Sequence, residues 1–150
     1  MTNRTMKGLA GAALAAALAA GCGTKSYVKG GKVTDTITQD PAKGSNIEAI
    51  GIGAADSSLP TETQRRSLSR DASIVKAQYE MLSMVKGVEI EGGITVSRAI
   101  EKDSTLEAKL KEVIKGAEIV KTEFTKDDGA VTTMRLPKKR LEAMMGVRFK

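Results

Sequence analysis

Histidine and tryptophan are absent from this chain of 150 residues, and cysteine occurs only once. Without histidine the chain has neither the commonest general base nor the partner of serine in a Ser-His pair. A single cysteine excludes an internal disulfide, and the lack of a Cys/His cluster excludes an ordinary structural zinc site. We therefore expect a protein that is not an enzyme and that holds no metal and no cofactor.

Aromatic side chains are also scarce, because the chain has only two tyrosines and two phenylalanines. These are too few for a platform on which nucleic-acid bases stack, and the net charge of +6 is mild and spread along the sequence. We expect no nucleic-acid partner, although the positive excess could favour anionic cell-wall polymer or lipid head groups. Hydrophobic residues make up 41% of the chain, which is enough for a core of aliphatic side chains and methionine.

After residue 21 no segment approaches the roughly 20 apolar residues that a membrane-spanning helix needs. Residues 1–21 are typical of a signal peptide, because Arg4 and Lys7 are followed by a run of glycine, alanine and leucine. Leu18–Cys22 (LAAGC) resembles a lipobox, in which small residues precede the cut and the cysteine thiol receives diacylglycerol. We expect cleavage before Cys22 and lipidation of its sulfur. A secretory leader with an incidental cysteine and a short amphipathic anchor are the alternatives.

The residues after the cysteine indicate where the anchor lies. Gly23 stands where an aspartate would be the usual signal for retention in the inner membrane. We therefore expect a lipid anchor in the outer membrane, with the protein on its periplasmic side. Residues 22–45 show no sustained apolar period and are predicted to be the lipidated cysteine and a flexible tether. A short strand that includes Val33 and Ile37 is the alternative.

Residues 46–150 are predicted to form a single α+β domain. Ile47–Ile52 has the pattern of a strand, and Thr61–Gln64 has the capping-box pattern that begins a helix. That helix should run to about Lys86 and stop at Gly87. Its predicted buried stripe has spacings of four, three, four and three residues and consists of Leu68, Ala72, Val75, Tyr79 and Leu82. Ile74, Met81 and Val85 are predicted to widen this buried face.

The second half of the domain is predicted to contain shorter elements. Val88–Val96 alternates apolar and polar residues and predicts one strand, with a bulge or bend at Gly92-Gly93. A second helix is expected from a capping box at 104–107 to Gly116. Strands are expected at 119–125 and 130–136, joined by a turn at 127–129, and a short helix is expected at 138–145. Val147 and Phe149 are expected to pack on the core or to form an edge strand. We expect a mostly antiparallel sheet of three or four strands packed on one long helix plus a second, shorter helix.

From Ile50 onward the chain resembles the Lpp-twenty family of small lipoproteins. The similarity rests on Ala49–Gly53 (AIGIG), Arg70–Ala72 (RDA), Tyr79–Val88 (YEMLSMVKGV), Val113–Val120 (VIKGAEIV) and Asp128-Gly129. This resemblance implies a non-enzymatic envelope protein with a hot-dog-like or strand–helix–strand fold. Because some members build rings or disks around the flagellar motor, it also implies a structural, ring-forming and flagellum-associated role.

The edges of the predicted sheet and the basic residues near the C-terminus indicate which partners this chain could have. We expect self-association, or association with other envelope proteins, through the edges of the sheet. Lys138, Lys139 and Arg140 give the C-terminal region a positive bias, and they are either contacts to an anionic partner or a solvated helix face. The alternative function is therefore a binding module that recognises peptidoglycan or anionic lipid through this basic face.

Two further patterns have a chemical and a structural interpretation. Glu89 and Glu91 share a strand face and could hold a cation, but a solvent-exposed strand face is the simpler interpretation. Gly51-x-Gly53 precedes a helix and could present amides to a phosphate. It lacks the third glycine of a dinucleotide site, and close approach of the backbone is the simpler interpretation.

Overall fold

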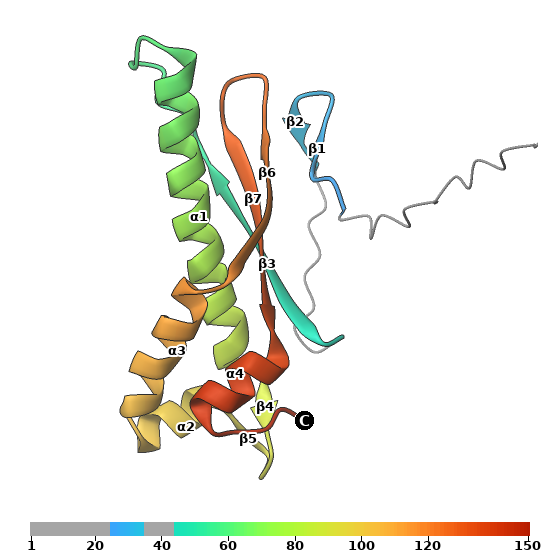
Figure 1. Ribbon diagram of the computed structural model, residues 1–150, viewed down its shortest axis with the longest axis vertical. Coiled ribbons are helices and arrows are strands. Elements are labelled where there is room, and N and C mark those ends of the chain that lie inside the picture. Colours follow the sequence, from blue (N-terminus) through green and yellow to red (C-terminus); the bar gives the residue numbers. More distant parts are fainter. Residues whose placement is uncertain (1–24, 35–43) are drawn as a thin grey trace, which may run out of the picture.

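The computed structural model describes residues 25–34 and 44–150 of the chain. Its centre is an antiparallel sheet with the order β3-β7-β6, formed by Asn46–Gly53, Ala130–Pro137 and Glu118–Phe124. The long helix α1, Glu62–Lys86, lies along one face of this sheet, and a small β1–β2 hairpin lies on the other side (Figure 1). The predicted α+β class, with an antiparallel sheet on one long helix, is confirmed.

Helix α1 begins and ends where its capping residues predict. Thr61 Oγ1 accepts a hydrogen bond from the Gln64 amide at 3.2 Å, and Gln64 Oε1 accepts one from the Thr61 amide at 3.3 Å. These bonds satisfy amides that the start of a helix leaves without an intrahelical partner. At the other end, the Gly87 amide donates to the carbonyls of Met84 and Val85. Capping alone therefore fixes both bounds of the helix.

The prediction for the buried face of α1 is wrong for the stripe itself, whereas the predicted burial of Met81 and Val85 beside it is confirmed. The residues that α1 buries are Ser69, Ser73, Ala77, Met81 and Val85. Of the stripe predicted to be buried, Leu68, Val75 and Tyr79 are instead 47%, 65% and 64% exposed. The sheet thus lies against the face of the helix that carries small and polar side chains in its first half, and the large apolar stripe lies outside.

Two glycines of β3 explain why the helix turns this way. A Cβ atom on Gly51 would lie 1.9 Å from the Ser73 carbonyl oxygen, and one on Gly53 would lie 2.0 Å from that of Ser69. The strand and helix backbones are therefore nearly in contact, which only glycine allows. Small side chains on the helix complete the fit. Ser73 Oγ lies 2.6 Å from Thr132 Oγ1 on the neighbouring strand β7, so its hydroxyl is not left unpaired.

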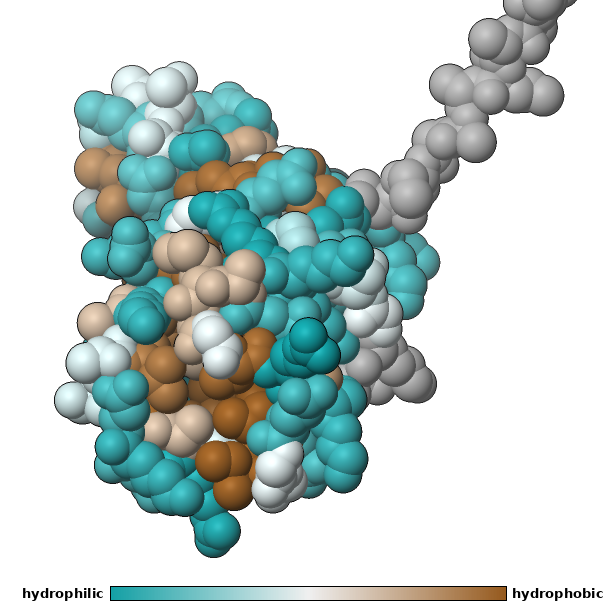
Figure 2. All heavy atoms as spheres, turned by 60° about the horizontal axis from the view of Figure 1, so that its bottom comes forward, coloured by the Kyte–Doolittle hydropathy of each residue, from teal (hydrophilic) through white to brown (hydrophobic). Residues whose placement is uncertain are grey.

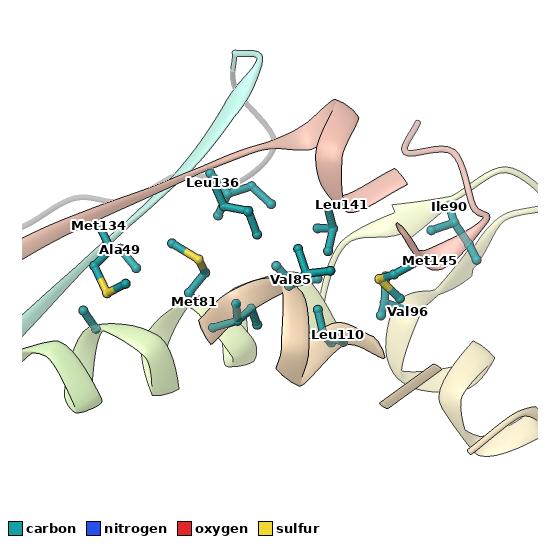
Figure 3. Packing of buried hydrophobic residues seen from close by; sticks show 14 of the residues in the cluster. Ala49, Met81, Val85, Ile90, Val96, Leu110, Met134, Leu136, Leu141 and Met145 are labelled. Carbon is teal, nitrogen blue, oxygen red and sulfur yellow. The ribbon is translucent and has the colours of Figure 1, made fainter. Parts of the chain in front are cut away.

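The apolar core lies at the other half of α1, where methionine and valine replace serine. Figure 3 shows Met81 and Val85 of α1 among Leu136, Leu110 and Leu141, which come from β7, α3 and α4. All five residues are fully buried. The C-terminal helices therefore belong to the same core as the sheet.

The segment predicted to be one long strand is a tight hairpin followed by a helix. β4 (Glu89–Ile90) pairs with β5 (Ile94–Thr95), and the chain then enters α2, Val96–Lys102. Gly92 and Gly93 have φ angles of +100° and +73°, a conformation that closes a turn rather than a bulge. The Thr95 hydroxyl accepts from the Arg98 amide and caps α2, which the alternating pattern did not predict.

The remaining helices lie close to their predicted positions. α3 spans Thr105–Lys115, and α4 spans Lys138–Met145 after Pro137. The predicted capping box at Ser104 is wrong, because Ser104 makes no side-chain cap bond. Instead, Asp103 Oδ1 accepts from the Thr105 amide at 3.0 Å. No terminal strand longer than one bridge forms among the described residues, where Phe149 pairs with Ile90.

Candidate functional site

The exposed stripe of α1 is the most conspicuous candidate surface. Its side chains follow one another at helical spacings of three and four, so neighbours along the stripe lie side by side. Ala72 is also exposed, and Leu82 is partly exposed. Lys76 Nζ lies over the Tyr79 ring, 5.2 Å from its centre. Contiguous exposed apolar surface of this kind marks an interaction site more often than isolated residues do.

Helix α3 extends this surface at the C-terminal end of α1. A shallow depression of about 150 Å³ lies between the two helices, and its lining is mainly apolar. Tyr79 and Leu82 form its wall on α1, and Ile114 forms part of its wall on α3. Lys111 and Lys115 stand at its border. The depression is thus an apolar notch with a positive rim, continuous with the stripe.

A second apolar area lies at the end of the molecule that carries α2, α4 and the β4–β5 hairpin (Figure 2). Its members are packed against the core and only partly exposed, and they include Ile94, Ile100, Leu106, Val147 and Phe149. These side chains form the rim of the core. Of the stripe on α1, Leu82 also packs against the core, whereas Leu68, Val75 and Tyr79 are exposed. The stripe is therefore the better candidate for contact with a partner.

The turn between β6 and β7 is clamped to the start of α1 through Asp128. Arg65 Nε and Arg66 Nε donate to its carboxylate at 2.8 and 3.0 Å, and Ser69 Oγ donates to its carbonyl at 2.6 Å. The hydrogen bond from Arg65 is the main cause that lowers the pKa of Asp128. The turn itself was predicted, but this clamp was not. A cluster of arginines in the first turns of a helix opposes the helix dipole and was the available signal that an acidic partner lay nearby.

Part of the predicted tether is attached to the sheet. Residues 25–34 form the β1–β2 hairpin, with strands Val28–Lys29 and Lys32–Val33, rather than a free coil. The Ser26 hydroxyl and the Tyr27 amide both donate to the carboxylate of Glu123 on β6, and the Lys126 amide donates to the Gly31 carbonyl at 3.0 Å. Glu123 therefore holds the start of the hairpin on the face of the sheet opposite α1.

The charge of Glu123 is stabilised by the same contacts. Partial burial opposes its ionisation, but hydrogen bonds from Ser26, the Tyr27 amide and Lys121 outweigh burial, so its pKa is lowered from 4.5. Burial, with the nearby charges of Glu48 and Glu123, raises the pKa of Tyr27. A carboxyl group whose pKa is lowered by folding stabilises the folded form above its ordinary pKa. That contribution is lost as the pH falls through the lowered value.

We therefore expect acid, or the substitution Glu123→Gln, to release the hairpin. A glutamine side chain offers one acceptor where two donors converge, and the loss should be about 1 kcal/mol. The measurement is hydrogen exchange at the Lys126 amide, which should lose protection in the variant at neutral pH and in the native chain as the pH falls through the lowered pKa of Glu123. Glu118→Gln, at the exposed start of the same strand, is the matched control and should leave that amide protected. Unchanged protection in Glu123→Gln would contradict the clamp.

The basic residues predicted to contact an anionic partner do not form one free cluster. Arg140 Nη1 donates to the Gly116 carbonyl at 2.9 Å and so caps the end of α3. Lys138 is only partly exposed, and its amide donates to the Ser45 carbonyl. Lys139 is exposed. At least Arg140 therefore has a structural role, while Lys139 lies on a solvated surface.

The other sequence candidates have structural roles in the fold. Gly51 and Gly53 face the backbone of α1 at close range. The Glu89 carboxylate lies 3.7 Å from Lys150 Nζ at the surface, and Glu91 is exposed in the β4–β5 turn. Within residues 25–34 and 44–150, no group of three or more acidic or cysteine side chains is placed to hold a metal ion. Cys22, the predicted site of lipidation, lies outside the described residues.

Comparison with known proteins finds no relative of this chain. The chain gives no significant match to a family model, to a curated protein or to a solved structure. In the described part of the chain, no helix combines the length and the apolar character needed to cross a membrane. Function is therefore inferred from the residues of this chain alone.

Proposed function

We propose that this chain is a non-enzymatic lipoprotein of the outer membrane, held by lipid on Cys22, with a structural or assembly role on the periplasmic side of the envelope. The observation that carries the assembly role is the apolar stripe on α1, whose central residues Val75 and Tyr79 are 65% and 64% exposed. A capped and firmly packed helix presents this stripe, so a partner would bind a preformed surface and little order would be lost on binding.

The attached hairpin supports a close connection between anchor and domain. Only residues 23 and 24 stand between Cys22 and Lys25, where the described hairpin segment begins. Three residues of extended chain span about 10 Å at most. A lipid on Cys22 would therefore hold the domain near the membrane surface, instead of on a long free tether. Such a short connection suits a component that must be positioned in an assembly.

The resemblance to Lpp-twenty lipoproteins suggests the most specific version of this role, a flagellum-associated ring or disk. A closed ring needs two different contact surfaces on each copy. The edge strands β3 and β6 are candidates for one of them, since each pairs with β7 on one side only within the described sheet. The second candidate function is a module that binds peptidoglycan or anionic lipid. Salt-sensitive sedimentation with peptidoglycan, lost on changing Lys138 and Lys139 to alanine while Arg140 is kept at the end of α3, would favour it.

The anchor is tested by fractionating cells and measuring the intact mass of the extracted protein. We expect the native chain in the outer-membrane fraction, cleaved before Cys22 and carrying three acyl chains. Cys22→Ser should leave the membrane fraction, because a chain without lipid has no comparable membrane affinity. A native chain that is soluble or carries no lipid would contradict the anchor.

The assembly role is tested on the same membranes by native gel electrophoresis. The native protein should run as a complex larger than one chain, and Val75→Glu should disrupt it by placing a charge in the contact. Ser67→Glu, also exposed on α1 but off the stripe, is the matched control. A complex that survives Val75→Glu would show that the stripe is not the contact.

A further inference from the structure

We infer that the stripe on α1 is the contact surface for a second copy of this chain, with the two α1 helices side by side and parallel. This rests on the proposed assembly function and names its partner. The members of the stripe are Leu68, Ala72, Val75, Tyr79 and Leu82, and their spacings alternate between four and three residues. That alternation is the heptad pattern by which two helices pack along their length.

In the single copy the first four residues of the stripe are exposed, and Leu82 packs partly against the core. A buried helix face on a globular core drifts around the helix, as the buried residues of α1 do at constant spacings of four: Ser69, Ser73, Ala77, Met81, Val85. The exposed stripe instead keeps an average spacing of 3.5 residues over two heptads, the repeat that stays in register with a second helix. Because the sheet already orders α1, two heptads can associate without the cost of forming the helix.

The charges beside the stripe favour a second copy over a membrane surface. We call the two sides that flank the stripe along the helix its shoulders. One shoulder carries Asp71 and Gln78, and the other carries Lys76 and Ser83. An amphipathic helix that lies on a membrane is typically rich in lysine and arginine on its polar face. One acidic and one basic shoulder complement each other when the surface meets its own copy.

The same charges select the parallel orientation. Asp71 and Lys76 are five residues apart on opposite shoulders, which is the spacing at which flanking residues of parallel helices meet. An antiparallel pair centred on Val75 would place the two Lys76 side chains near each other. The side chains of Asp71 and Lys76 are 70% and 51% exposed. Their contacts within one copy, to Arg70 at 3.6 Å and to Glu80 at 2.7 Å, are surface pairs that a partner can replace at little cost.

Cysteine cross-linking of the full chain, extracted from membranes and purified alone, tests the inference. Leu68→Cys and Leu82→Cys are each oxidised separately and then as a mixture. A parallel pair brings residue 68 to residue 68 and residue 82 to residue 82, so each variant should form a covalent dimer by itself. Ser67→Cys, exposed on the same turn as Leu68 but off the stripe, should react at least about tenfold more slowly. The native chain controls for Cys22.

The outcomes separate this inference from the proposed function. Cross-linking of Leu68→Cys that is no faster than that of Ser67→Cys would overturn the inference. So would a covalent dimer that forms only when Leu68→Cys and Leu82→Cys are mixed, because that product requires antiparallel helices. A purified chain that stays monomeric while the membrane complex still depends on Val75 would also overturn it, yet would leave the assembly role intact through another protein.

A charge exchange provides an independent readout in the same preparation. Asp71→Lys should weaken the dimer about tenfold, since Lys76 of the other copy would then face a like charge. Adding Lys76→Asp restores opposite charges and should recover most of the affinity. Equal affinity of the native chain and Asp71→Lys would show that these shoulders do not meet.

Discussion

Replacing Gly51 with alanine is expected to destabilise the domain by about 3 kcal/mol or more, because the added methyl group has no room. It would lie 1.9 Å from the Ser73 carbonyl oxygen and 2.3 Å from the Ala77 amide nitrogen. Both atoms belong to the backbone of α1, so no side chain can move aside to make space. The helix and strand β3 would have to separate, and contacts along the whole layer would loosen.

Urea unfolding followed by circular dichroism measures this effect. Gly87→Ala is the matched control, since its added Cβ would meet nothing closer than the Met84 carbonyl oxygen at 3.5 Å. The control should change the free energy of unfolding by less than about 0.5 kcal/mol. Equal stability of Gly51→Ala and Gly87→Ala would contradict the close approach of helix and strand.

Leu110→Ala is expected to cost about 2–5 kcal/mol, the range found when a large aliphatic side chain is removed from a core. Leu110 is 0% exposed, and Figure 3 shows its side chain directed from α3 toward Val85 of α1. It belongs to the core cluster, together with Val85, Val113 and Leu141. The cavity left by alanine would therefore be apolar and would stay empty.

Leu68→Ala removes the same atoms from the exposed stripe and is the matched comparison. Because Leu68 is 47% exposed, the substitution should cost under about 1 kcal/mol when the protein is dilute enough to be monomeric. Thermal unfolding of both variants at low concentration measures the difference. A larger loss for Leu68→Ala than for Leu110→Ala would mean that α1 buries the other face.

Local signals in the sequence were sufficient for most element bounds. The Thr61–Gln64 capping box, Gly87 and Pro137 act within one helical turn, so the residues themselves specify α1 and the start of α4. The turn at 127–129 is likewise local, with Asp128 at a φ of +62°. These predictions required no knowledge of the partner elements.

The face that α1 buries could not be read from α1 alone. Hydrophobic periodicity correctly found a continuous apolar stripe, but the burial of a helix face depends on the surface that meets it. Gly51 and Gly53 leave room for serine and alanine only, and this shape requirement outweighs the larger apolar area of the stripe. The pattern A-x-G-x-G in β3 and the spacing of Ser69, Ser73 and Ala77 were the complementary signals.

The wrong predictions for the start of α3 and for the turn at Gly92-Gly93 also have local causes, in residues next to those that were considered. Asp103 supplies the side-chain hydrogen bond predicted for Ser104, and Gly92 with Gly93 turns the chain back where a bulge was predicted. Lys138, Lys139 and Arg140 were predicted to contact an anionic partner because they form a run of positive charge. A run along the sequence does not reveal that Arg140 reaches across to the Gly116 carbonyl.

The most direct test of the account compares the accessibility of two cysteines on opposite faces of α1. Val75→Cys and Ser73→Cys, each in the full chain at low concentration, are treated with a water-soluble maleimide, and the labelled fraction is followed by mass spectrometry. Val75 is 65% exposed and Ser73 is 0% exposed. We predict rapid labelling at position 75 and labelling at position 73 only after denaturation. Rapid labelling at 73 with protection at 75 in the monomer would contradict the buried small-residue face, and with it the free apolar stripe on which the assembly role rests.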